Sequence, residues 1–310
     1  MIKRTLCFSN PCYLSTKDEQ LIIKWPEANN KDLPEVIRKE AAQTVPIEDI
    51  GVVVLDCQQL TITSSLMEKL TENNVAIISC DNCHLPIGLM LPLCGGNTVQ
   101  TKRQRQQIES SLPLRKQLWQ QTVQQKIANQ ATVLSDMRNA EIKNMRQWQQ
   151  DVKSGDSDNK EARAAAYYWR NMFPEIDGFV RSREGVFPNN LLNYGYAIVR
   201  AVIARALVAA GLLPTLGLHH RNKYNAYCLA DDIMEPYRPV VDKIVIELYE
   251  KDKENKEIDK ERKISLLSIP TKEVKIGGVR SPLLVAASTT ASSLQKCFAG
   301  EARKIIYPEL

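Results

Sequence analysis

The order of apolar and polar residues changes near position 95. Before it, apolar residues gather in short runs of strand length separated by polar turns. The runs that predict strands are TLCFSN near the start, YLSTKDEQLIIKW with a turn at Lys17–Gln20, GVVVLD at 51–56, VAIISC at 75–80 and LPIGLMLPL at 85–93. One short helix is expected in SSLMEKLTENN, where Ser65 and Glu68 have the spacing of a capping box.

After position 95 the apolar spacing becomes helical. The stretch CGGNTVQ at 94–100 has the composition of a linker, and the polar segment behind it predicts a helix. The segments with helical patterns are the one containing Trp119, Val123 and Ile127, the Ala-rich 161–173, the apolar 191–213, and the run after Pro239. The pattern predicts an α+β protein of two domains, a β-rich domain at 1–95 and a larger all-α helical domain at 96–310.

Charge is distributed unevenly between these halves. The chain has 310 residues, 44% of them hydrophobic, and a formal net charge of +5. Residues 1–100 carry 8 Lys and Arg against 12 Asp and Glu, whereas residues 101–310 carry 33 against 24. A basic C-terminal half favours a polyanion partner such as nucleic acid, but a solvated basic surface explains the charge equally well.

The most apolar segment, residues 196–218, is expected to be a core helix. Arg200 and Arg205 interrupt it, and each arginine would cost about 2.5–3.5 kcal/mol at a membrane centre. Because Lys3 and Arg4 are followed by no apolar run, the start of the sequence does not resemble a signal peptide. We therefore expect a soluble, cytoplasmic protein without a membrane partner, and its eight cysteines are expected to be mostly reduced.

The stretch GLHHRNKYNAYCLADDIMEPYRP at 217–239 concentrates candidate chemistry. It holds His219 and His220, and the acids Asp231, Asp232 and Glu235 follow within sixteen residues. One imidazole with carboxylates is a donor set that suits Mn²⁺ or Mg²⁺. The alternative is structural: one aspartate caps a helix starting near Ala230, and Glu235 is a first-turn acid. The residues alone leave both interpretations open.

Other motifs narrow the possibilities. A metal site of nuclease type needs a further carboxylate, for which Glu161 at the head of the Ala-rich helix is a candidate. CDNCH at 80–84 matches a haem-attachment pattern and half of a zinc site, and only Cys94 follows nearby; we expect neither haem nor zinc there. The sequence has no phosphate-binding glycine loop and no Glu-x-x-His pair before its histidines.

At these residues the chain resembles a known family, the CRISPR-associated integrases (the "Cas-one" proteins). The resemblance covers nearly the whole chain. Its motifs are RTLCFSNPCYLS, VPIEDIGVVVLD, LTITSSLMEKLTENNVAIISCDNCHLPIGLMLPL, the long NYGY, GLHH, DDIMEP and RP block, and the closing GEARKIIYPEL. The form of this block is most similar to members from type II systems. The second cysteine of CDNCH departs from the family motif.

The resemblance assigns the metal ligands. The family's glutamate stands at the head of an E-x-x-A-A-x-x-Y-[FW] helix, which places it at Glu161. The family's histidine corresponds to His220 rather than His219, and its last acid to Glu235, with Asp232 as a supporting acid. Asp231 remains a candidate cap for the helix that presents Glu235.

The resemblance also implies the activity. Such proteins join short DNA fragments to a CRISPR array by transesterification, using Mg²⁺ or Mn²⁺, and water as nucleophile gives endonuclease activity. The implied partners are double-stranded DNA (the new spacer fragment and the repeat), a second copy of the chain held through the N-terminal domain, and a smaller "Cas-two" protein that bridges two dimers into a heterohexamer.

Basic residues of the C-terminal half are candidates for DNA contacts. They are Lys102, Arg103, Arg105 and Lys223. Two rival functions remain: a structure-specific DNA repair nuclease on the same fold, and a non-catalytic DNA-binding scaffold. A scaffold is expected to have lost part of the acid and histidine set, which is complete in this sequence.

Overall fold

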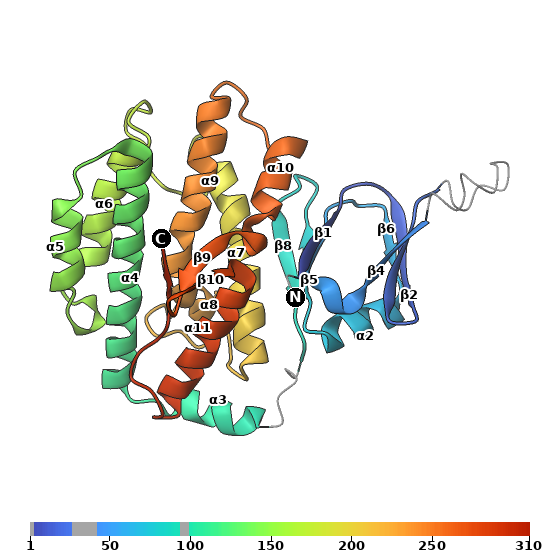
Figure 1. Cartoon of the computed structure of the whole chain (residues 1–310), viewed down its shortest axis with the longest axis horizontal. Coiled ribbons are helices and arrows are strands. Elements are labelled where there is room, and N and C mark those ends of the chain that lie inside the picture. The colour runs from blue at the N-terminus through green and yellow to red at the C-terminus, as the bar shows by residue number, and fades with distance from the viewer. Residues whose placement is uncertain (1–2, 27–41, 94–98) are drawn as a thin grey trace. The chain divides into compact units, whose positions relative to one another are not determined.

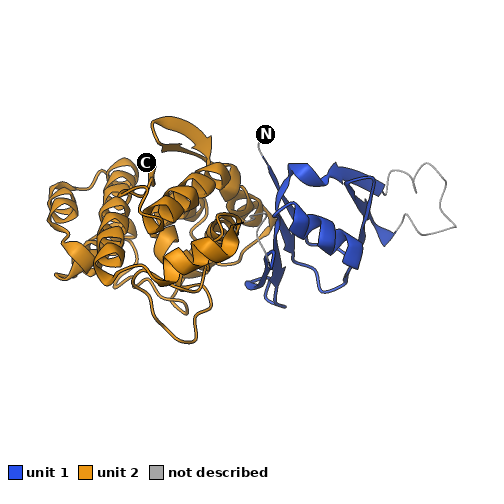
Figure 2. Ribbon diagram, turned by 90° about the horizontal axis from the view of Figure 1, so that it is seen from below, with its two compact units in different colours: residues 1–96 blue, residues 97–310 orange. Residues whose placement is uncertain are grey.

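The computed structural model describes residues 3–26, 42–93 and 99–310. The chain divides into two compact units, residues 1–96 and 97–310, shown in blue and orange in Figure 2. The first unit is rich in strands and the second is mostly helical (Figure 1), which confirms the α+β class. The predicted linker at 94–100 lies outside the described residues except for its last two positions.

One sheet of the N-terminal unit has the strand order β1-β5-β7-β8. Its strands are β1 (Arg4–Phe8), β5 (Ile50–Leu55), β7 (Ala76–Cys80) and β8 (Pro86–Met90). The first three run parallel, and β8 returns antiparallel to β7. Parallel neighbours need long connections, and helix α2 (Ser64–Glu72) lies in the connection from β5 to β7.

The second sheet of this unit has the order β4-β3-β2-β6. Its strands are β4 (Ala42–Pro46), β3 (Gln20–Lys24), β2 (Cys12–Lys17) and β6 (Leu60–Ile62). The turn between β2 and β3 falls at the predicted position, Lys17–Gln20. Its two central residues, Asp18 and Glu19, have φ of 52° and 56°. Two left-handed residues form the tight turn whose twist suits a hairpin.

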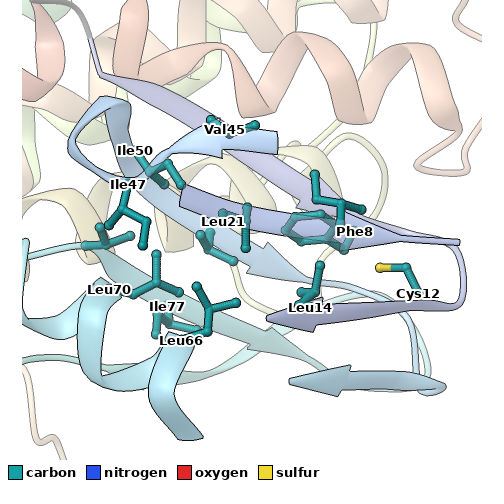
Figure 3. Packing of buried hydrophobic residues seen from close by; sticks show 13 residues of the cluster. Phe8, Cys12, Leu14, Leu21, Val45, Ile47, Ile50, Leu66, Leu70 and Ile77 are labelled. Atoms are coloured by element: carbon teal, nitrogen blue, oxygen red, sulfur yellow. The ribbon is translucent and has the colours of Figure 1, made fainter. Parts of the chain in front are cut away.

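A hydrophobic cluster joins both sheets and α2 (Figure 3). Leu14 and Leu21 come from one sheet, Ile50 from the other, and Leu66 and Leu70 from the helix. These side chains are almost completely buried, and those of β2 and β3 alternate with more exposed residues, as in half-buried strands. The apolar runs of the sequence therefore predict the core of this unit correctly.

The cap of α2 differs from the prediction. The helix begins at Ser64, and its N-cap is Thr63, whose side chain accepts a hydrogen bond from the Leu66 N–H. The predicted capping box of Ser65 and Glu68 is wrong, because both residues already lie inside the helix. Three adjacent hydroxyl residues offer several cap positions, and spacing alone does not choose among them.

Helices form most of the C-terminal unit (Figure 1). They are α3 (Gln100–Ile108), α4 (Leu112–Arg138), α5 (Lys143–Asp151), α6 (Lys160–Met172), α7 (Asn189–Ala209), α8 (Cys228–Met234), α9 (Arg238–Lys251), α10 (Lys260–Leu267) and α11 (Leu283–Phe298), with short 3-10 turns η3 (Ser154–Asp156), η4 (Glu235–Tyr237) and η5 (Ile269–Thr271). Trp119, Val123 and Ile127 are buried on one face of α4, which confirms the predicted helix.

The prediction of an all-α C-terminal domain is wrong in one respect. A small antiparallel sheet, with the order β10-β9-β11, consists of β9 (Glu273–Ile276), β10 (Val279–Pro282) and β11 (Pro308–Glu309). Gly277 and Gly278 form the turn between β9 and β10 with φ of 57° and 84°. Paired glycines between short alternating runs are a hairpin signal, which the helical composition around them obscured.

Helix α7 is the core helix that we expected in the most apolar segment, which Arg200 and Arg205 interrupt. Among the described helices it is the one long and apolar enough to cross a membrane, but 83% of its most apolar window is buried inside the protein. Because its apolar residues pack inside the protein, core packing is a sufficient explanation of its composition.

The helix expected to start near Ala230 begins two residues earlier, and the alternative in which an aspartate caps it is wrong. Helix α8 begins at Cys228 with Tyr227 as N-cap, so Asp231 and Asp232 lie inside the helix and are not its caps. Pro236 is accommodated because it lies in the first turn of η4, where a missing N–H costs little.

Candidate active site

Glu161 lies in the first turn of α6. Asp156 prepares this helix start, because its carboxylate accepts hydrogen bonds from the N–H groups of Lys160 at 2.8 Å and Glu161 at 3.0 Å. Two of the free N–H groups at the helix start are thereby satisfied. The Glu161 side chain itself is left for other contacts and is 23% exposed.

Glu235 opens the 3-10 turn η4 and is held between two basic residues. Arg238 Nε lies 2.9 Å from Glu235 Oε1, and Lys126 Nζ lies 2.6 Å from Oε2. These distances are those of ion pairs. The directions do not suit hydrogen bonds, so Glu235 Oε2 and Arg238 Nε have no hydrogen-bond partner among the described residues. The carboxylate is only 6% exposed, so its charge depends on these two partners.

Lys126 on α4 connects the two glutamates. Its Nζ lies 2.6 Å from Glu161 Oε1 as well as 2.6 Å from Glu235 Oε2. Sequence reasoning did not include Lys126, although a signal was present. It falls three positions after Val123 and next to Ile127, on the face of α4 that the apolar residues mark as buried. A lysine on such a face needs an anionic partner from another segment.

His220 is the last residue of a tight turn at 217–220 that Asp232 organises. Asp232 is completely buried and accepts hydrogen bonds from the N–H groups of Leu218, His219 and His220 at 2.6, 2.9 and 3.2 Å. It also lies 2.5 Å from His220 Nδ1. With the proton on Nδ1, Nε2 of the neutral ring carries the lone pair that a metal needs.

Gly217 is required at the start of that turn. A Cβ at this position would lie 2.4 Å from the His220 carbonyl oxygen and 2.8 Å from Asp232 Oδ2. No larger residue fits without moving the backbone or the carboxylate. The GLHH sequence is therefore a compact turn built around the Asp232 carboxylate.

The other two candidates in this stretch have different surroundings. The ring of His219 stacks on Trp119, with centroids 4.5 Å apart and planes 5° apart. Asp231 pairs with the guanidinium of Arg200 at 2.6 and 2.9 Å and accepts a hydrogen bond from Asn225 at 2.7 Å. Asp231 is thus a buried ion-pair partner and not the expected helix cap.

The electrostatics keep the centre ionised. Burial alone would lower the pKa of Lys126, but Glu235 and Glu161 outweigh it and raise that pKa. Burial alone would raise the pKa of Glu235, but Arg238 and Lys126 outweigh it and lower that pKa. The hydrogen bond to Asp232 raises the pKa of His220, and the charges of Glu235 and Glu161 act in the same direction. His220 therefore lies within electrostatic reach of both glutamates.

The residues present fit a divalent metal ion, although they do not form a finished site. In the part of the chain that the structure describes, no three His, Cys, Asp or Glu side chains already converge as ligands. Two carboxylates nevertheless share one cationic group, and the buried Oε2 of Glu235 has no well-directed donor. Asp232 is fully used by the turn, so Glu161, His220 and Glu235 are the ligand candidates that remain.

Beside His220 lies an open pocket of about 910 Å³. Basic and aromatic residues line part of it, namely Arg115, Arg221, Lys223 and Tyr224. Lys223 is thus close to the candidate site, whereas Lys102, Arg103 and Arg105 do not line this pocket. Arg103 instead donates a hydrogen bond to the Ala210 carbonyl at 3.0 Å, and Lys102 and Arg105 are exposed on α3.

We predict no haem and no structural zinc at CDNCH. Asp81 organises this turn by accepting hydrogen bonds from the N–H groups of Cys83 and Leu85 at 2.9 and 2.8 Å. The ring of His84 lies 3.0 Å from Asp56 Oδ1, which occupies one of its nitrogens. Cys94 lies outside the described residues. Metal analysis and an absorption spectrum of purified protein check this, and stoichiometric zinc or a Soret band contradicts it.

Comparison with known proteins gives the family. A family model described as "CRISPR associated protein Cas1" matches residues 6–274. The chain is 36% identical over 296 residues to a CRISPR-associated endonuclease Cas1 of Neisseria meningitidis serogroup C (strain 8013), which is 95% of this chain and 92% of that protein.

Solved structures agree at the level of the fold. A casposase bound to integration product has a TM-score of 0.76 and 19% identity, covering 98% of this chain and 92% of that one. A Cas6-RT-Cas1–Cas2 complex has a TM-score of 0.72 and 18% identity, covering 99% of this chain and 36% of that one.

The fold and the centre define a class: two-unit α+β proteins whose helical unit brings two glutamates onto one lysine, within electrostatic reach of a histidine. Within this class, the chain belongs to the CRISPR-associated Cas1 family. The resemblance drawn from the sequence motifs is thereby confirmed.

Proposed function

We propose that this protein is a metal-dependent DNA integrase and endonuclease of CRISPR adaptation. The observation that carries the proposal is the convergence of Glu161 and Glu235 on one cationic position, with His220 fixed nearby by Asp232. Family membership supports the enzyme class, since the Neisseria meningitidis relative is named an endonuclease. The form of the motifs supports a type II system, and we propose that the protein acts in the cytoplasm.

The reaction is a transesterification. The 3′-hydroxyl oxygen of the incoming DNA forms a bond to the phosphorus at the repeat boundary. The attacking hydroxyl gives up its proton to solvent, the bond from that phosphorus to the 3′ oxygen of the preceding nucleotide breaks, and the leaving oxygen takes up a proton. Water in place of the hydroxyl gives hydrolysis at the same centre. No nucleotide cofactor is consumed, because one phosphodiester replaces another.

Each residue of the centre has a role in this chemistry. Glu161, Glu235 and Nε2 of His220 would hold Mg²⁺ or Mn²⁺, which when bound polarises the phosphate and lowers the pKa of the attacking hydroxyl. Asp232 orients His220 through Nδ1. Arg238 lies against Oε1 of Glu235 and keeps this carboxylate ionised and oriented.

The proposed partners follow from the family. Double-stranded DNA is the substrate, the N-terminal unit holds a homodimer, and a Cas2 protein bridges two dimers into a heterohexamer. Arg115, Arg221 and Lys223 beside His220 supply charge for phosphate contacts. The presence of Cas1 with Cas2 in the Cas6-RT-Cas1–Cas2 complex supports Cas2 as the bridging partner.

An integration assay tests the function. Purified protein, Cas2, fragments with free 3′-hydroxyls and a plasmid carrying a repeat array are incubated with Mg²⁺ or Mn²⁺. Covalent joining at the repeat boundary is expected, and fragments ending in a dideoxynucleotide should not be joined. Cleavage of branched DNA without any preference for the array favours the repair nuclease. DNA binding with neither joining nor cleavage favours the scaffold.

DNA affinity is expected to depend on salt. On a log–log plot it should fall by roughly 0.9 of a unit per phosphate contact. Lys223→Ala should reduce this slope by about 1, because Lys223 lines the pocket beside His220. Lys275→Ala is the matched control, since Lys275 pairs with Glu309 in the small sheet. Titrations at several salt concentrations measure both, and equal slopes for both variants exclude Lys223 as a phosphate contact.

A further inference from the structure

Lys126 on α4 is a nearly buried lysine whose ammonium group contacts two carboxylates. Its side chain is 11% exposed, and its Nζ lies 2.6 Å from one oxygen of Glu161 and 2.6 Å from one oxygen of Glu235. Burying an ammonium is unfavourable unless anions compensate it. Both compensating anions are the carboxylates assigned above as metal ligands, so the ammonium and the metal compete for the same oxygens.

The two glutamates depend on Lys126 to different degrees. Arg238 Nε lies 2.9 Å from Oε1 of Glu235. Glu235 therefore keeps one cationic partner when Lys126 moves away from Oε2. The ion-pair partner that the structure shows for Glu161 is Lys126. Without a cation between them, two partly buried carboxylates would repel each other. An ammonium in this place therefore keeps the ligands together before a metal arrives.

We propose that Lys126 is an internal cation of the active site that takes the place of the metal ion and sets its affinity. Metal entry releases the ammonium from at least one carboxylate, and metal loss returns it. Metal binding is weakened by this exchange, while the metal-free centre stays assembled. This inference rests on the proposed function, because it requires Glu161 and Glu235 to be metal ligands.

Manganese titrations of the full-length protein without DNA test the role of Lys126. Lys126→Met removes the charge and keeps an unbranched apolar side chain. Mn²⁺ affinity, measured by calorimetry, should rise about tenfold, within the usual range for coupled sites. Thermal unfolding should show a lower midpoint without Mn²⁺ and a larger rise on adding Mn²⁺ than in the parent protein. Both readouts are independent of DNA cleavage.

Three variants make the outcome unambiguous. Lys116→Met removes an exposed lysine of the same helix and should leave Mn²⁺ affinity unchanged. Lys126→Gln is a second neutral variant, for use if the methionine protein does not fold. Lys126→Arg keeps the charge and should bind Mn²⁺ within a few-fold of the parent.

The results separate the inference from the proposed function. Neutral Lys126 variants with unchanged or weaker Mn²⁺ affinity, in a protein whose parent form binds Mn²⁺, overturn the role of Lys126. Glu161→Gln tests the ligand assignment separately and should abolish Mn²⁺ binding. A Glu161→Gln protein that binds Mn²⁺ like the parent contradicts the metal site itself, whatever the Lys126 variants do.

Discussion

Replacing either Glu161 or Glu235 by glutamine is expected to abolish integration and cleavage. Each loss should be on the order of a thousandfold or more, and the double variant should be hardly worse, because ligands of one ion act as a unit. His220→Ala should have a similar effect. The measurement is the rate of strand joining in Mg²⁺ and in Mn²⁺, with DNA affinity determined for each variant.

His219→Ala is the matched control for these variants. Its ring stacks on Trp119, so its loss should affect packing and leave most of the activity. An inactive His219→Ala protein beside an active His220→Ala protein would show that the assignment is displaced by one residue. If the three single ligand variants and His219→Ala all integrate DNA normally, the acids have a purely structural role. Glu235→Gln needs a folding check by circular dichroism, because it removes the buried partner of Lys126 and Arg238.

Asp232→Ala is expected to lower both stability and metal affinity. It leaves three N–H groups of the 217–220 turn without their acceptor, and the one of Leu218 is buried. Because an unpaired buried donor costs about 1–3 kcal/mol, the free energy of unfolding should fall by at least about that amount. Because His220 also loses the oxygen that orients it, Mn²⁺ affinity should fall about 10–100-fold. Chemical denaturation and calorimetry measure the two effects.

The neighbouring Asp231→Ala variant separates these effects. Asp231 is also buried, but its partner Arg200 is 43% exposed and can be solvated when the carboxylate is lost. Stability should fall less than in Asp232→Ala, and Mn²⁺ affinity should stay close to that of the parent. If Asp232→Ala binds Mn²⁺ normally, Asp232 is not the residue that positions His220.

The apolar pattern predicted much of the fold because local order and burial coincide in this chain. Strands such as β5 and β7 are continuous apolar runs, which buried parallel strands require. Helix α4 shows its buried face through Trp119 and Val123. The β9–β10 hairpin was missed because each strand has only four residues, too few for a period to stand out from the helices around it.

The site could be predicted only in part. Spacing placed Glu235 and both histidines in one stretch but did not distinguish a ligand from a helix cap. The residues offered Glu161 as a candidate, but only the resemblance assigned it as a ligand and chose His220 over His219. The role of Lys126 depends on contacts with residues 35 and 109 positions away in the chain, which no local pattern contains. Asp232, expected as a supporting acid, accepts hydrogen bonds from the 217–220 turn and lies against Nδ1 of His220.

The stacking of Trp119 against the histidine turn has a spectroscopic consequence. The indole is almost completely buried, 4.5 Å from the ring of His219 and 5.9 Å, edge to face, from that of His220. Excited indoles lose energy to protonated imidazoles in contact with them. Trp119 fluorescence should therefore report the charge and movement of these rings. With Trp25, Trp148 and Trp169 replaced by phenylalanine, stopped-flow fluorescence could follow events at the centre without an attached dye.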